Sequence, residues 1–304
     1  MLDLVIPARM AEITAGFAVK RILPYQLRRM LGPFIFMDHG GPINLPPPPP
    51  TNLDVLPHPH IGLSTVSYLF SGQVTHRDSL GTQQLIKAGE VNWMTAGKGI
   101  SHSERFEDPS LLLGGSLEMI QTWVALPEKE EESEPSFANY SIEDLPVYTE
   151  KGVWVRLIAG DAYGLKSKVK TSSPLFYLHV ELLQYSSFGL PRGYSERGIY
   201  IVKGSVNVAG IDYLQGNLLI FSNGVDPLIT ANEHTTMMIL GGEHLGERYI
   251  WWNFVSSSKE RIEQAKEDWK NGRIILPPND NLEFIPLPVQ NSRPAGGPPP
   301  PALS

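Results

Sequence analysis

Four residues able to bind a metal stand in two short motifs. They are His58 and His60 in LPHPHIG, and His102 and Glu104 in GISHSERF. Residues two apart on an extended strand point to the same face, so each pair could contact one ion. Three imidazoles and one carboxylate suit a divalent first-row metal such as iron, manganese, nickel, copper or zinc, and leave positions free for substrate and oxygen. The spacing therefore predicts a reactive metal site rather than a structural one.

The elements that would carry these motifs are predicted to be short strands. Runs such as VSYLF, LFYLHVELL, GIYIV and NLLIF are rich in β-branched and aromatic residues, and turn signals separate them at short intervals. This pattern is typical of an antiparallel β-sandwich or barrel. One amphipathic helix is predicted from Ser256 to Gly272, with serines to cap its start and Asn271-Gly272 to end it.

Two polar segments suggest how the chain is divided. The stretch EKEEESEP, from Glu128 to Pro135, has no apolar residue, so we expect a solvated linker or long surface loop and a domain boundary near residue 140. The end of the chain is rich in proline and glycine and cannot bury enough surface to order itself alone. We therefore predict a metal-binding domain at 1–140, a second domain at 141–285 and a tail at 286–304.

An internal repeat restricts the metal to the first domain. Residues 58–74 align without gaps on 190–206, and residues 88–104 align on 215–231, with shared glycines, a proline and a tyrosine. In the second copy the four candidate ligands read Leu190, Arg192, Ile229 and Ala231. Their joint loss is expected if the four form one site, because a site that lacks one ligand has little use for the others. The second domain is then a metal-free scaffold or partner surface.

Composition excludes several classes of function. The 304 residues include no cysteine, which excludes disulfides, iron–sulfur ligation and a thiolate nucleophile. A net charge of −7 without a lysine- and arginine-rich block argues against direct binding of nucleic acid. The first residues do not form a secretion signal, and no apolar run reaches membrane-spanning length. We expect a soluble cytoplasmic protein.

Two longer stretches, HPHIGLSTVSYLFSGQVTHRDSLGTQQLIKAGEVNWMTAGKGISHSE (58–104) and IWWNFVSSSKERIEQAKEDW (250–269), resemble the pirin family of the cupin superfamily. The resemblance covers most of the chain. It implies an all-β fold of two cupin (double-stranded β-helix, jelly-roll) barrels packed face to face, with a short C-terminal helix. It also implies one metal in the N-terminal barrel. The ligands of the family map onto His58, His60, His102 and Glu104.

The resemblance further implies quercetin 2,3-dioxygenase activity, in which a flavonol such as quercetin is cleaved with O2 and CO is released. It favours Fe2+ as the metal, with Mn, Ni, Cu, Co and Zn as alternatives. Glu104 is the ligand able to leave the metal and accept a proton from the substrate hydroxyl, so we assign it a second role as general base. The expected partners are a small phenolic substrate and O2, and the expected state is a monomer.

Other functions stay open at this point. The chain could be a metal-containing protein-binding or redox-sensing regulatory module that resembles a transcriptional cofactor, has a protein partner and shows no significant turnover. A hydrolytic or isomerising metal centre is a third possibility, because cupins host many chemistries. His76 lies between the two ligand motifs and is a candidate to support a ligand from behind.

Overall fold

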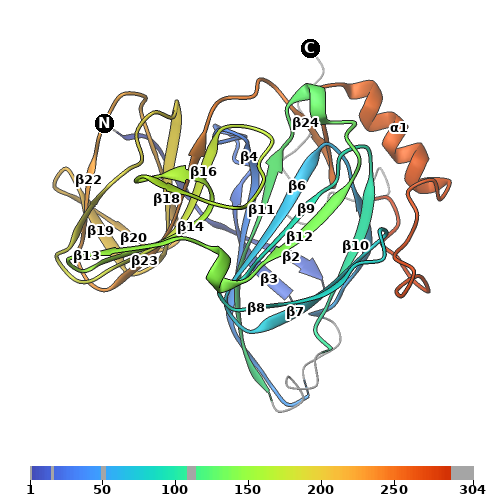
Figure 1. The fold of residues 1–304 in the computed structure, drawn as a ribbon, viewed down its shortest axis with the longest axis horizontal. Coiled ribbons are helices and arrows are strands. Elements are labelled where there is room, and N and C mark those ends of the chain that lie inside the picture. The colour runs from blue at the N-terminus through green and yellow to red at the C-terminus, as the bar shows by residue number, and fades with distance from the viewer. Residues whose placement is uncertain (1, 15–16, 49–52, 108–113, 289–304) are drawn as a thin grey trace. The chain divides into compact units, whose positions relative to one another are not determined.

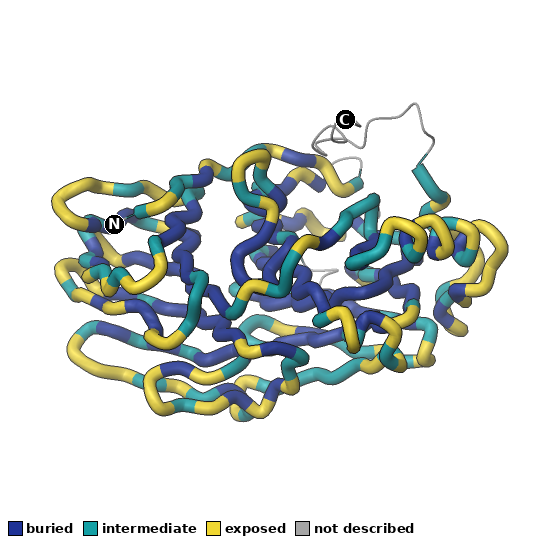
Figure 2. The backbone as a smooth tube through the Cα atoms, turned by 90° about the horizontal axis from the view of Figure 1, so that it is seen from above, coloured by how far each residue is buried: buried dark blue, intermediate teal, exposed yellow. Residues whose placement is uncertain are grey.

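The computed structural model describes residues 2–14, 17–48, 53–107 and 114–288. Apart from one α-helix and two short 3-10 helices, η3 (Glu128–Glu130) and η4 (Ile142–Asp144), its elements in these ranges are strands. The expected all-β fold is thus confirmed. The strands are largely buried and the turns between them largely exposed (Figure 2).

The described chain folds into two units whose segments alternate along the sequence. The first, which we call the histidine unit, comprises Met10–Arg21, Met37–Asn139 and the chain from Gly246 onward. The second, which we call the apolar unit, comprises the chain up to Arg9, Ile22–Phe36 and Tyr140–Leu245. The division of the sequence at residues 140 and 285 stays a prediction.

The histidine unit is built from two antiparallel sheets. The smaller sheet has the order β5-β10-β7-β8, with bounds β5 (Val55–His60), β7 (Gln73–Asp78), β8 (Gln83–Lys87) and β10 (Ile100–Arg105). The larger sheet has the order β12-β9-β6-β11-β4-β3-β2. Its bounds are β2 (Arg9–Thr14), β3 (Phe17–Leu23), β4 (Phe34–Leu45), β6 (Leu63–Ser71), β9 (Val91–Thr95), β11 (Gly115–Ala125) and β12 (Ser136–Tyr140). Several of these strands are labelled in Figure 1.

The apolar unit repeats the same pair of sheets. Its smaller sheet has the order β17-β22-β19-β20, with bounds β17 (Ser187–Gly189), β19 (Ser205–Val208), β20 (Ile211–Leu214) and β22 (Leu228–Ala231). Its larger sheet has the order β1-β21-β18-β23-β16-β14-β13, and β15 pairs with β14. Its bounds are β1 (Leu2–Pro7), β13 (Val147–Glu150), β14 (Val153–Ala162), β15 (Leu165–Lys166), β16 (Leu175–Leu182), β18 (Glu196–Lys203), β21 (Asn217–Phe221) and β23 (Thr235–Gly242).

In each unit apolar side chains from the two sheets meet in one core. In the apolar unit, Val206 and Ile229 of the smaller sheet pack in the same cluster as Ile199 and Met237 of the larger sheet. In the histidine unit, Val74 of the smaller sheet shares a cluster with larger-sheet residues in the same way. Two sheets closed over a common core make each unit a cupin barrel, so the protein is a bicupin.

The last elements of the chain belong to the histidine unit. They are β24 (Tyr249–Trp251), β25 (Phe254–Ser256) and the helix α1 (Lys259–Lys270), the coiled ribbon of Figure 1. Ser258 caps α1 by accepting a hydrogen bond from the Arg261 N–H at 3.2 Å, which confirms the predicted serine cap. Ile262, Ala265 and Trp269 form its buried side, in a cluster with Phe254.

The acidic stretch is not the purely solvated loop that its composition predicts. The Glu131 side chain is buried, forms an ion pair with Arg248 Nε at 3.0 Å and accepts a hydrogen bond from Ser256 Oγ at 2.7 Å. A buried carboxylate is tolerated only with such partners. Since these partners are distant in sequence, composition could not show that this loop anchors the segment before α1.

No helix in the part of the chain that the structure describes is both long and apolar enough to span a membrane. Most of the predicted tail, residues 289–304, lies outside the described residues.

Candidate metal centre

The four predicted ligands lie on the two neighbouring strands β5 and β10. His102 stands directly across the ladder from His58, and on its other side it stands across from Asp78 of β7. The register with β5 then shifts, so that Glu104 faces Val55. A bulge of this kind re-aims side chains at the point where pairing is interrupted.

The three histidines converge. One ligand nitrogen from each of His58, His60 and His102 lies within 4.8 Å of the other two, and the Nε2 atoms of His60 and His102 are 3.1 Å apart. All three side chains are buried. The ring of Trp123, on the larger sheet, meets the His60 ring edge-on at 5.1 Å. The imidazoles therefore point into the barrel between its two sheets.

Backbone carbonyls fix which nitrogen of two of these rings carries the proton. His58 Nδ1 is 2.9 Å from the Leu56 carbonyl oxygen, and His60 Nδ1 is 3.1 Å from that of Asn253. A carbonyl only accepts hydrogen bonds, so both Nδ1 atoms must be the protonated ones. The Nε2 atoms are left with free lone pairs, which is the state in which imidazole binds a metal.

Electrostatics at the site favour a cation. Burial lowers the pKa of His58 to about 4 and the pKa values of His60 and His102 well below their ordinary value. The rings are therefore neutral at pH 7 and can offer nitrogen lone pairs to a cation, and the Nε2 atoms of His60 and His102 are only 3.1 Å apart. A divalent metal at their meeting point could be bound by both, so the residues present fit a metal.

Glu104 follows His102 on the same face of β10 but is not part of the three-histidine group. Its side chain is half-buried, and burial raises its pKa to about 7. Within the described residues, neither a hydrogen bond nor a charged partner counters this effect. A half-buried carboxyl group without a charged partner is compatible with a fourth ligand or a proton acceptor.

The outer face of β10 is held by residues 273–288, which we call the C-terminal strap. Ser101 Oγ donates to the Ile275 carbonyl at 2.6 Å, and Ser103 Oγ donates to Asp280. Arg105 makes two bonds to the Asp280 carboxylate, at 2.8 and 2.7 Å, which raise the pKa of Arg105 and lower that of Asp280. These alternate residues leave the opposite face of β10 for His102 and Glu104.

The ladders correct the gapless alignment of the two copies. Ile229, aligned with His102, pairs with Phe188 rather than Leu190. If Ile229 is the counterpart of His102, then Phe188 replaces His58 and Leu190 replaces His60. Each counterpart lies two residues before the one that the gapless alignment gives. The substitutes remain buried and apolar, because a shift of two residues preserves the face of a strand.

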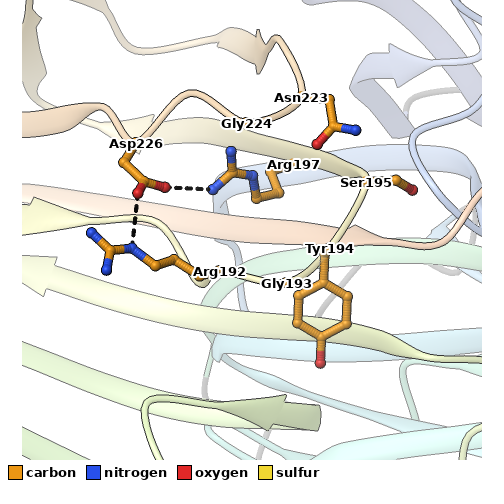
Figure 3. Close-up of a pocket in the computed structure, with 8 residues that line it drawn as sticks. All are labelled: Arg192, Gly193, Tyr194, Ser195, Arg197, Asn223, Gly224 and Asp226. Atoms are coloured by element: carbon orange, nitrogen blue, oxygen red, sulfur yellow. Dashed lines mark hydrogen bonds and ion pairs between the residues drawn. The ribbon is translucent and has the colours of Figure 1, made fainter.

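Arg192 accordingly does not occupy a ligand position. It is 80% exposed and lies on the rim of a surface pocket of the apolar unit, where it forms an ion pair with Asp226 at 2.8 Å (Figure 3). The buried Arg197 approaches the same carboxylate at 3.3 Å. This pocket holds no cluster of metal-binding side chains among the residues that the structure describes.

Sequence reasoning did not single out Asp78 or Phe137. His76 Nε2 is 3.0 Å from Asp78 Oδ2, and the His76 ring stacks on Phe137 with centroids 4.5 Å apart. Asp78 had a detectable signal, because His76 and Asp78 repeat the two-residue spacing of the ligand pairs. Phe137 lies on β12, and the local sequence around it gives no sign that it contacts His76.

Comparisons with known proteins agree with this geometry. Residues 16–124 match the Pirin family, and residues 177–275 match the Pirin C-terminal cupin domain. A pirin-like protein of Caulobacter vibrioides is 52% identical over 289 residues, which cover 95% of this chain and 100% of that protein. The structure of a quercetin 2,3-dioxygenase from Acinetobacter baumannii superposes with a TM-score of 0.86 at 31% identity, covering 97% of this chain and 98% of the other.

Proposed function

The chain belongs to the pirin family, and we propose that it is a metal-dependent dioxygenase that cleaves flavonols such as quercetin with O2 and releases CO. The observation that carries this proposal is the convergence of three buried, neutral imidazoles on one point, with Glu104 two residues after His102 on the same strand. The similarity to the Acinetobacter baumannii enzyme supports the substrate class.

In this proposal His58, His60, His102 and Glu104 hold the metal, with Fe2+ favoured over Mn, Ni, Cu, Co and Zn. When bound, the metal supplies Lewis-acid and redox chemistry at this point. The three histidines fix its place, because two of them are anchored through Nδ1 to backbone carbonyls. The surrounding barrel excludes bulk water, which strengthens every electrostatic interaction inside it.

Glu104 is proposed to act as the general base. Its carboxylate is the one acid–base group among the four proposed ligands that can leave the metal, accept a proton from a phenolic hydroxyl and release it again. Glu104→Gln keeps an oxygen that can face the metal but cannot accept this proton. We therefore expect it to retain some metal and to lose turnover.

The test is oxygen uptake with quercetin, together with detection of CO, on protein reconstituted separately with each of the six metals. Chelation and His58→Ala should abolish turnover, whereas His234→Ala, at an exposed histidine of the apolar unit, should leave it unchanged. Absence of turnover with every metal would overturn the dioxygenase and leave a metal-containing regulatory module as the alternative. Product formation without O2 would instead indicate a hydrolytic or isomerising centre.

A further inference from the structure

We propose that Asp78 and His76 form a relay of hydrogen bonds that sets the proton position of His102 and so tunes the metal site. The proposal rests on the metal-binding part of the proposed function and does not depend on the flavonol substrate. In this relay His76 and Asp78 are positioning residues, since they act through His102.

The three side chains form a continuous chain inside the histidine unit. His102 Nδ1 lies 3.4 Å from His76 Nδ1, and His76 Nε2 lies 3.0 Å from Asp78 Oδ2. The other carboxylate oxygen, Oδ1, accepts hydrogen bonds from the backbone N–H groups of Leu80 at 2.9 Å and Thr82 at 3.1 Å. Asp78 is therefore held from behind by a turn, and its orientation is fixed independently of the histidines.

In the relay each histidine donates one hydrogen bond toward Asp78. The Asp78 carboxylate only accepts, so His76 Nε2 must donate. The hydrogen bond between the two rings is then donated by His102 Nδ1–H to the lone pair of His76 Nδ1. His102 is left with a free lone pair on Nε2, the atom that faces His60 Nε2 at 3.1 Å.

His102 differs from the other two histidines in the kind of partner it has. His58 and His60 are oriented by backbone carbonyls, which are neutral. His102 is oriented by a side-chain relay that ends in a carboxylate, so it alone of the three histidines is linked by hydrogen bonds to a negatively charged group. A carboxylate behind a histidine ligand raises the basicity of that ligand and favours the more highly charged state of a metal.

The relay is buried and sterically held. His76 is 5% exposed and Asp78 is fully buried. Phe137 lies flat against His76, with an angle of 19° between the rings. A polar pair buried to this extent costs stability unless its hydrogen bonds are made, and here Leu80 and Thr82 satisfy Asp78 while Asp78 satisfies His76 Nε2.

The apolar unit supplies an internal comparison. If Ile229 is the counterpart of His102, the ladder between β22 and β19 makes Val206 the counterpart of His76 and Val208 that of Asp78. Both valines are buried in the apolar core. The relay and the ligands are thus replaced together, as expected if they serve one site.

The experiment measures Co2+ binding by the full-length protein, by competition with a chelator, for wild type, Asp78→Asn, His76→Gln and His76→Phe. Asp78→Asn and His76→Phe should weaken Co2+ binding about 10- to 100-fold while one Co2+ still binds at saturation. The Co2+ absorption spectrum should change as well, which a purely structural defect elsewhere in the barrel would not cause. His76→Gln retains a donor and an acceptor and should recover part of the affinity. His234→Gln, on the surface of the apolar unit, is the matched control.

Wild-type affinity and an unchanged spectrum in both Asp78→Asn and His76→Phe would overturn the relay, even if quercetin turnover were observed. Conversely, weakened Co2+ binding in the variants of a protein that never turns over quercetin would support the relay and overturn the dioxygenase. Wild-type protein that binds no Co2+, Fe2+ or Ni2+ would overturn both. Circular dichroism identifies any variant that fails to fold, and His76→Gln then carries the test, because it leaves the Asp78 turn intact.

Discussion

The two smaller sheets of this protein, β5-β10-β7-β8 and β17-β22-β19-β20, have the same strand order, but the side chains on their inward faces differ in polarity. One presents three converging histidines with His76 and Asp78 behind them. The other presents valine, leucine, isoleucine and phenylalanine at the corresponding ladder positions. The strand order therefore does not determine whether the interior can bind a metal. What separates a metal centre from an apolar core is a few side chains on the inward face, together with the partners that keep them satisfied.

The largest effect is expected from converting the first interior into the second. His58→Phe with His102→Ile should weaken metal binding more than about 100-fold and abolish turnover, because two of three imidazoles are lost. Without metal, the free energy of unfolding of the double variant should exceed that of metal-free wild type by about 2 kcal/mol, because buried polar rings are replaced by apolar ones. Metal analysis and urea unfolding check both parts. A double variant that still binds metal tightly would break the comparison.

The reverse substitution should fail to create a site. Ile229→His places an imidazole in an apolar core with no second histidine across the ladder. We expect a loss of about 3 kcal/mol in the free energy of unfolding and no additional bound metal. Leu228→His, at the neighbouring exposed position, is the control and should change stability by less than about 0.5 kcal/mol. Equal stability of the two variants would show that the apolar interior tolerates polar groups after all.

Acid should destabilise the metal-free protein, in large part through the histidines of the metal centre. Burial lowers the pKa of His58 from 6.5 to about 4, so the unfolded chain binds this proton at a higher pH than the folded chain does. Stability is then fully present above pH 6.5 and is lost as the pH falls toward 4, by about 3 kcal/mol for His58 alone. His60 and His102 act in the same direction.

Glu104 acts in the opposite direction over part of this range. Its pKa is raised from 4.5 to about 7, so its contribution to stability is present below pH 4.5 and is lost as the pH rises toward 7. Unfolding measured from pH 7.5 to 4.5 should still show net acid destabilisation, because the three site histidines, together with buried His39 and His179, oppose one carboxyl group. The slope should flatten in the His58→Phe, His102→Ile variant and steepen in Glu104→Gln. A metal-free wild type with no pH dependence would contradict the assigned burial of these rings.

The smallest effect is expected from the outer face of β10. Asp280→Asn weakens the bonds from Ser103 and Arg105 that hold the C-terminal strap, and should cost about 2 kcal/mol of stability and a few-fold in metal affinity. Glu283→Gln is a matched control. Glu283 approaches the same arginine at 3.5 Å but is 58% exposed, so little change is expected. If Asp280→Asn lowers neither stability nor metal affinity, the strap does not position the site.

Much of this protein could be predicted from its sequence. The all-β class, the capped helix that contains Trp269 and the grouping of His58, His60 and His102 in one site follow from local spacing, from the internal repeat and from the family resemblance. The errors concern partners that are distant in the chain. The acidic stretch was expected to be solvated, yet Glu131 pairs with Arg248. The gapless alignment gave Leu190 as the counterpart of His58, whereas the ladder with Ile229 gives Phe188.

The sequence by itself determined that two pairs of ligand-type side chains share faces of their strands, because the alternation of side chains along a strand is a local property with a period of two. Only the tertiary structure decided which strands meet. It brought Asn253 to the Nδ1 atom of His60, Asp280 to the back of β10 and Phe137 to the face of His76. Such partners depend on how the sheets close and on which unit the end of the chain joins, and local spacing carries no information on either.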